Sequence, residues 1–144
     1  MEELIQRILQ KVGSVRETRT QHEVLAFGKR LELSLSPFFI SLYTRVGDGG
    51  FGPGIAGIPS LATLEARLAE VRNDPDDDWP HRFVEFVGYG CSQCSGIDLG
   101  APQNPVHYID GDGGRGDLYD SVSAYHDSLD AYFSDWLKSH TSKK

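Results

Sequence analysis

The sequence is poor in cysteine and in basic residues. Two cysteines in 144 residues do not make a disulfide framework. The 14 lysine and arginine residues are outnumbered by 21 acidic residues, which gives a net charge of −7 at pH 7. Because this charge would repel phosphates, neither a nucleic acid nor an anionic membrane is expected as the main partner.

Targeting and membrane signals are also scarce. The chain begins with Glu2 and Glu3, where a signal peptide would carry positive charge, and the apolar residues that follow are interrupted. No stretch approaches the roughly 20 apolar residues that a transmembrane helix needs. We therefore expect a cytoplasmic protein. Its length favours a single domain, residues 1–144, that is large enough to bury a hydrophobic core.

Apolar residues recur at helical spacing in several parts of the chain. The predicted helices cover residues 2–12 and 20–31 and begin after Ser36, Ser60 and Ser121. Serine is favoured at the N-cap because its hydroxyl accepts a hydrogen bond from a free backbone N–H group. Pro37 strengthens the first of these three starts, since proline suits the first helical position.

Short runs rich in strand-forming residues lie mainly in the second half of the chain. The predicted strands cover residues 55–58, 83–87, 91–99 and 106–109. Gly88-Tyr89-Gly90 is predicted to form a turn. Strands that lie close together in sequence and are joined by short turns favour an antiparallel sheet. The expected fold class is therefore α+β, with helices packed on this sheet.

The stretch Gly47–Gly54 has five glycines among its eight residues. Glycine adopts positive φ angles at little steric cost, so the stretch predicts a helix end at Gly47 followed by tight turns. A phosphate-binding loop is the alternative. It would need a strand before it and a helix N-terminus after it. Here a predicted helix comes first and Asp48 would repel phosphate, so the turn interpretation is favoured.

Cys91 and Cys94 have the spacing found in zinc and redox sites. A zinc site would need two more ligands, and the spacing of His81 and His107 matches no common zinc module. A redox pair is expected at a helix N-terminus, whereas these cysteines lie in a predicted strand. Two buried, unreactive thiols are the favoured interpretation, with zinc binding and redox chemistry as the alternatives.

Motifs for catalysis and calcium binding are incomplete. Asp110 and Asp112 have the spacing of a calcium loop, but Arg115 stands at the required glycine position and Ser121 at the position of the glutamate. The five histidines belong to no nucleophile or metal motif. We therefore expect no enzyme activity and no cofactor.

Several motifs follow one another in a specific order. The chain runs from the Ser36-Pro37 helix start through Gly47–Gly54, a leucine-rich helix, Trp79-Pro80, Gly88–Cys91, Ile97-Asp98-Leu99 and Pro105–Tyr108 to an aromatic terminal helix. This order resembles the SUKH superfamily, named partly after a yeast cell-wall synthesis regulator. The resemblance covers about residues 20–138. Residues 1–19, which precede this region, are expected to form an N-terminal helix and a polar loop.

The resemblance implies a twisted, mostly antiparallel sheet flanked by helices, and no catalysis. Bacterial members of the superfamily are mostly immunity proteins, which bind a polymorphic toxin, often a nuclease or deaminase, and block it. The fungal members imply an alternative, an intracellular scaffold or regulatory module. A small metal or redox protein that uses Cys91 and Cys94 is a further alternative.

Acidic loops are the candidate partner contacts. Nuclease toxins are often basic because they bind phosphate, and an acidic surface would speed their association with this protein. Alternatively, these residues are solvated loop charges. The candidate contact residues are Asp74, Asp76, Asp77 and Asp78, with Asp48, Asp110 and Asp112 as lesser candidates.

Overall fold

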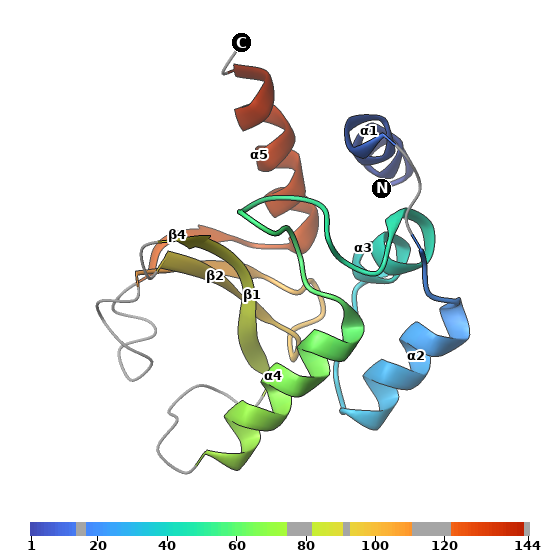
Figure 1. The fold of residues 1–144 in the computed structure, drawn as a ribbon, viewed down its shortest axis with the longest axis vertical. Coiled ribbons are helices and arrows are strands. Elements are labelled where there is room, and N and C mark those ends of the chain that lie inside the picture. Colours follow the sequence, from blue (N-terminus) through green and yellow to red (C-terminus); the bar gives the residue numbers. More distant parts are fainter. Residues whose placement is uncertain (14–16, 75–81, 91–92, 111–121, 143–144) are drawn as a thin grey trace.

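Helices and one antiparallel sheet make up the fold in the computed structural model (Figure 1). The structure describes residues 1–13, 17–74, 82–90, 93–110 and 122–142. None of the helices in these ranges has the length and apolar character of a membrane span. The helices are α1 (Glu2–Val12), α2 (Gln21–Arg30), α3 (Pro37–Ser41), the π-helical segment η1 (Leu42–Val46), α4 (Leu61–Asn73) and α5 (Leu129–Ser142).

Side-chain capping sets the start of α2, α3 and α4. Thr20 and Glu23 form a capping box, in which the Glu23 N–H group donates to Thr20 Oγ1 at 3.1 Å and the Thr20 N–H group donates to Glu23 Oε1 at 2.9 Å. Ser36 and Ser60 each accept a bond of 3.1 Å from the amide three residues further on. These contacts satisfy N–H groups that a helix leaves without partners. The helix starts predicted at Ser36 and Ser60 are confirmed.

The sheet contains four strands, which pair in sequence order. The strands are β1 (Phe83–Gly90), β2 (Gln93–Asp98), β3 (Val106–Asp110) and β4 (Val122–His126). Every neighbouring pair is antiparallel, with Val84 opposite Ile97 and Ile97 opposite Val106. Pairing of consecutive strands needs only short connections. The predicted α+β class with an antiparallel sheet is confirmed.

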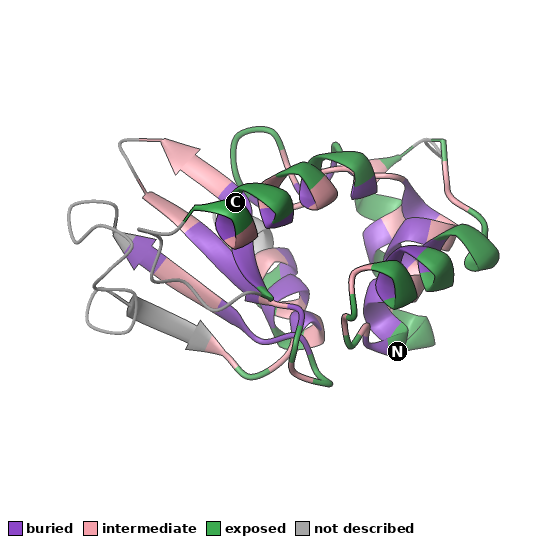
Figure 2. Ribbon diagram, turned by 90° about the horizontal axis from the view of Figure 1, so that it is seen from below, coloured by how far each residue is buried: buried purple, intermediate pink, exposed green. Residues whose placement is uncertain are grey.

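The hydrophobic core lies between the sheet and the helices, where the buried positions of Figure 2 face one another. Phe133 of α5 is fully buried in this core. The centroid of its ring lies 5.8 Å from that of Phe38 and 6.3 Å from that of Phe51. Phe133 therefore joins the terminal helix to α3 and to the residues that follow η1.

The N-terminal helix belongs to this core. Ile5 and Ile8 are fully buried, and α1 lies beside η1 and α5 (Figure 1). The Arg45 guanidinium donates to both carboxylate oxygens of Glu2, at 2.5 and 2.7 Å. These hydrogen bonds lower the pKa of Glu2 to about 2. The ammonium of Lys11 lies 5.6 Å from the ring centroid of Trp136 in α5.

Two local predictions in the middle of the chain are wrong. Residues 55–58 do not form a strand, because Gly57 has a φ of +76° and the backbone turns back on itself there. Gly88-Tyr89-Gly90 is not a turn but the end of β1, where Gly88 lies opposite Cys94 and Gly90 opposite Gln93. Pairing with β2 overrides the local preference of glycine for turns.

The predicted start of the terminal helix is also wrong. Val122–His126 forms β4, and the helix begins only at Leu129, where the Ser128 hydroxyl accepts from the Ala131 N–H group at 3.1 Å. Ser121, the predicted N-cap, lies outside the described residues. Short apolar runs fit helical and strand periods equally well. The open edge of β3 decides between them, because it pairs with residues 122–126.

Candidate functional site

The loop between η1 and α4, residues 47–60, contains the glycine-rich stretch and is held by its own backbone. The Gly50 N–H group donates to the Ile58 carbonyl and the Ile58 N–H group to the Phe51 carbonyl, both at 2.8 Å. The side chains of Phe51 and Ile58 are buried in the core. The predicted helix end at Gly47 is confirmed, since the Gly47 N–H group donates to the Leu42 carbonyl at 3.0 Å. This η1–α4 loop is therefore a packed element.

Close packing accounts for glycine at two positions of the η1–α4 loop. Gly49 has a φ of +85°, and a Cβ atom there would lie 2.6 Å from the carbonyl carbon of Pro59. Gly54 has a φ of +84°, and a Cβ atom there would lie 2.1 Å from Cγ1 of Val87. Only glycine combines this backbone conformation with such close contacts.

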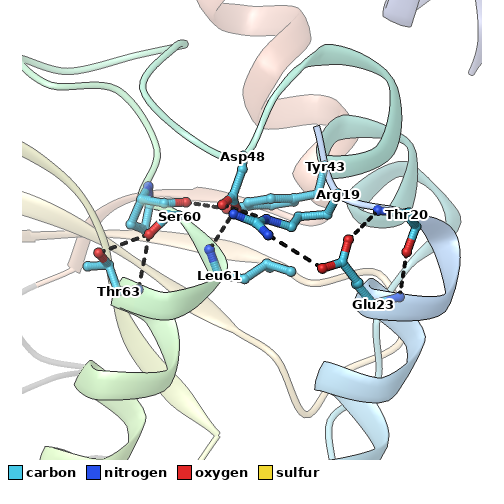
Figure 3. A network of polar contacts seen from close by, with 9 residues as sticks. Arg19, Thr20, Glu23, Tyr43, Asp48, Ser60, Leu61 and Thr63 are labelled. Atoms are coloured by element: carbon cyan, nitrogen blue, oxygen red, sulfur yellow. Dashed lines mark hydrogen bonds and ion pairs between the residues drawn. The ribbon is translucent and has the colours of Figure 1, made fainter. Parts of the chain in front are cut away.

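Asp48 lies at the N-terminus of α4, and both of its carboxylate oxygens have partners (Figure 3). Oδ1 accepts from the Leu61 N–H group and Oδ2 from Nε of Arg19, both at 2.9 Å. Arg19 also pairs with Glu23, at 3.4 Å. The Asp48 side chain is only 12% exposed. This internal carboxylate takes the place that a bound anion would take in a phosphate loop.

Tyr43 holds the end of the η1–α4 loop that leads into α4. Its side chain is fully buried, and its hydroxyl donates to the Pro59 carbonyl at 2.6 Å (Figure 3). Burial raises the pKa of Tyr43 well above its ordinary value, and the nearby charge of Asp48 adds to the shift. The phenol therefore remains protonated at neutral pH and keeps its hydrogen bond to the loop.

A hollow of about 380 Å³ lies between α2 and α4, next to Asp48. Ala26 and Ala62 are among the residues that line it. Both arginines in its wall form ion pairs, Arg19 with Asp48 at 2.9 Å and Arg30 with Glu65 at 2.6 Å. The first pair connects the segment before α2 to the η1–α4 loop and the second connects α2 to α4, so both arginines already have acidic partners within the protein.

A second hollow, of about 350 Å³, lies between the tip of the η1–α4 loop, α4 and β1. We call it the Ile55 groove. It is lined on the loop side by Ile55, on α4 by Thr63 and Arg67, and on β1 by Glu85 and Gly88. The Ile55 side chain is 78% exposed, the highest value among the large hydrophobic residues that the structure describes. An apolar side chain thus stands at the rim of a concave surface.

The described candidate contact residues lie far apart. Asp48 and Asp74 are at opposite ends of α4, a helix of 13 residues and so about 20 Å long. Asp110 ends β3 opposite Gln93, at the end of the sheet remote from Phe83, the first residue of β1. Asp76, Asp77, Asp78 and Asp112 lie outside the described residues. The role of these aspartates as partner contacts stays a prediction, and Asp48 has internal partners.

Of the two cysteines, the structure describes Cys94. It lies in β2 opposite Gly88 and Ile109, and it is half-buried where a buried thiol was expected. Cys91 and His81 lie outside the described residues. Within the described ranges, no three His, Cys, Asp or Glu side chains are grouped closely enough to hold a metal ion.

His107, one of the two histidines weighed as zinc ligands, lies in β3. Its ring meets that of Phe83 edge to face, with centroids 5.4 Å apart. Partial burial lowers the pKa of His107, and the charge of Asp98 opposes this shift. The imidazole therefore favours its neutral form at neutral pH.

A buried hydroxyl cluster joins α5 to the sheet and has no signal in the sequence. The Tyr89 hydroxyl lies 2.6 Å from the Ser95 hydroxyl and 2.5 Å from the Tyr132 hydroxyl. Ser95 and Tyr132 are both buried. Burial raises the pKa of Tyr132 above its ordinary value, and the neighbouring Tyr89 adds to the shift. The Tyr132 phenol therefore stays protonated at neutral pH, and its hydrogen bond with Tyr89 connects α5 to β1.

No model of a protein family, no curated protein and no solved structure matches the chain. The function is therefore inferred from the residues of this chain and from their contacts.

Proposed function

We propose that this protein binds a cognate polymorphic toxin by direct protein–protein contact and thereby neutralises it. The proposed toxin is basic, a nuclease or a deaminase. The observation that carries the proposal is the order of motifs from Ser36-Pro37 through Gly47–Gly54 to the aromatic terminal helix, which resembles the SUKH superfamily. Binding rather than catalysis is the role that this resemblance implies.

The positions of the motif residues support a binding role. Ser36 caps α3, Phe51 is buried in the core, and Gly54 packs against β1. These residues are engaged in building the fold. Recognition is accordingly left to exposed residues that the motifs do not include, as expected of a fold that carries different binding surfaces.

The net charge of −7 supports a basic partner. Opposite net charges accelerate the encounter of two proteins, and the acceleration falls as salt screens the charges. A nuclease toxin carries a basic cleft for phosphate, so an acidic inhibitor is suited to it.

Co-purification followed by a toxicity assay tests the proposal. The protein is used to capture partners from lysate of its source organism, and the bound proteins are compared with the products of neighbouring genes. We expect one neighbour-encoded protein with a basic C-terminal domain. Expression of that domain alone should arrest growth, and co-expression of this protein should restore it. Recovery of many cell-wall or signalling proteins, without such a neighbour, would favour the scaffold alternative instead.

Neutralisation of Asp76, Asp77 and Asp78 to asparagine tests the electrostatic part of the proposal. We expect the association rate with the toxin domain to fall severalfold at low salt, because a cluster of like charges contributes most to steering. The rate is measured by stopped-flow fluorescence at several salt concentrations. The matched control carries Glu3→Gln, Glu17→Gln and Asp127→Asn, which removes the same charge from exposed positions elsewhere. Equal association rates for both variants would show that the acidic run is not part of the interface.

A further inference from the structure

We infer that the Ile55 groove is the surface that receives the toxin. This inference rests on the proposed function and adds to it the location and the chemistry of the contact. The occupant is a basic protein surface that places an apolar side chain against Ile55 and a lysine or arginine beside Glu85.

The backbone that carries Ile55 is fixed before any partner binds. The Ile55 N–H group donates to the Gly88 carbonyl at 3.0 Å, which ties the tip of the η1–α4 loop to β1. On either side of the tip, Phe51 and Ile58 are anchored in the core. A contact residue on a rigid backbone loses little conformational entropy on binding, which favours its use as an anchor.

Two glycines of β1, Gly88 and Gly90, leave room for the hollow next to Ile55 because they have no side chains. A Cβ atom added at Gly88 would meet no atom within 4 Å, so the surface above this residue is open. At Gly90 an added Cβ would lie 3.2 Å from Cδ1 of Ile55, which places this methyl group over the end of β1. A single exposed apolar residue is ordinary on a protein surface. Here the apolar residue borders a concavity of about 350 Å³, where a partner side chain can be enclosed.

The partner does not dock by adding a strand to β1. The Glu85 carbonyl accepts from Nη1 of Arg67 at 3.1 Å, and the Gly88 carbonyl accepts from the Ile55 N–H group at 3.0 Å. Both carbonyls are thus already bonded on the open edge of the strand. Strand addition needs free backbone groups on such an edge. Recognition at this groove therefore occurs through side chains.

The charges around the groove favour a basic occupant. Among the described residues, the carboxylates of Glu70 and Glu85 form no ion pair or hydrogen bond. Glu70 is exposed and follows Thr63 and Arg67 on one face of α4, at spacings of seven and three residues. Arg67 is engaged with the backbone of β1. The two carboxylates outnumber the single positive charge of Arg67, so the rim carries a net negative charge.

Substitutions in the groove test the inference with the basic toxin domain identified by co-purification as the probe. Ile55→Asp should weaken binding at least tenfold, mainly through faster dissociation, because it puts a charge into an apolar contact. The control is Leu25→Asp on α2, since Leu25 is also an exposed aliphatic residue, at 48%. This control should bind within about twofold of wild type. Affinity and rates are measured by surface plasmon resonance.

Gly88→Val provides an independent variant that fills the groove. Its Cβ points into open space and valine suits a strand, so the variant should fold and unfold like wild type. We expect it to weaken toxin binding at least tenfold as well. Glu85→Gln should lower affinity by about threefold to tenfold and reduce the dependence of the association rate on salt.

The possible results separate this inference from the proposed function. If the toxin domain binds wild type, Ile55→Asp and Gly88→Val with equal affinity, the groove is not the interface, although neutralisation stands. If the toxin domain fails to bind wild-type protein, both proposals are wrong. If only the groove variants lose binding while Leu25→Asp keeps it, the toxin occupies the Ile55 groove.

Discussion

At the scale of single residues, Asn104 connects parts of the chain that are distant in sequence. It is fully buried and adopts a φ of +52°, a conformation that asparagine tolerates better than most residues. Its Oδ1 accepts from the Ser36 N–H group at 2.8 Å. Its Nδ2 donates to the Ser34 carbonyl at 2.6 Å and to the Ala101 carbonyl at 3.0 Å. One side chain thus joins the start of α3 to the loop between β2 and β3.

We expect Asn104→Ala to destabilise the protein by roughly 2–4 kcal/mol, because buried backbone groups lose their hydrogen-bond partners. Urea unfolding followed by circular dichroism measures the change. Gln103→Ala is the control, since its side chain is exposed, and it should change stability by less than about 0.5 kcal/mol. Equal stability of the two variants would show that the hydrogen bonds of the Asn104 side chain do not stabilise the fold.

At the scale of elements, the η1–α4 loop connects helices to the sheet. Asp48 binds Arg19 and the start of α4, Tyr43 binds the Pro59 carbonyl, and Ile55 binds β1 through its backbone. Contacts in several directions hold the loop in one conformation. The exposed position of Ile55 is therefore a property of the fold and not of a freely moving loop tip.

A pair of glycine variants tests how tightly the η1–α4 loop is packed. Gly54→Ala should cost roughly 2–4 kcal/mol, because its Cβ would collide with Val87 and its φ is positive. Gly50→Ala has a similar φ of +79° but open space around the added Cβ, so it should cost only about 1 kcal/mol. Unfolding in urea measures both changes. Hydrogen exchange should also show faster exchange of the Ile55 amide in Gly54→Ala alone. Similar costs for both variants would mean that the loop adapts to an added methyl group.

At the scale of the whole molecule, the two ends of the chain pack together. Ile5 and Ile8 of α1 and Phe133 and Leu137 of α5 belong to one buried cluster with α3 and η1. The interaction of Arg45 with Glu2 joins α1 to η1 on the surface of this cluster. The N-terminal helix is thus part of the folded unit.

We expect Ile8→Ala to destabilise the entire protein by roughly 2–4 kcal/mol, because it leaves a cavity in the shared core. Unfolding is followed by far-ultraviolet circular dichroism, together with amide signals of the sheet in nuclear magnetic resonance spectra. Gln10→Ala, an exposed change in the same helix, should leave stability within about 0.5 kcal/mol of wild type. If the sheet signals kept their midpoint in Ile8→Ala, α1 would be an independent appendage.

Local signals predicted α1 to α4 well, but they placed the terminal helix over the residues of β4 and ended β1 too early. Ser36 and Ser60 mark helix starts because an N-cap acts on amides within three residues. Gly88 and Gly90 were misread because a strand depends on its neighbour in the sheet. The candidate site was predicted only in part. The sequence singles out the glycine-rich stretch but does not indicate that Asp48 binds Arg19 or that Ile55 is exposed.

The sequence by itself determined the α+β class, the starts of α3 and α4, the end of η1 at Gly47 and the acidic charge. These features depend on residues close together in the chain or on composition alone. Only the tertiary structure decided that Val122–His126 is a strand, that α1 joins the core, and that Ile55 borders a groove over Gly88. These outcomes depend on contacts between distant segments, whose energies outweigh local conformational preferences.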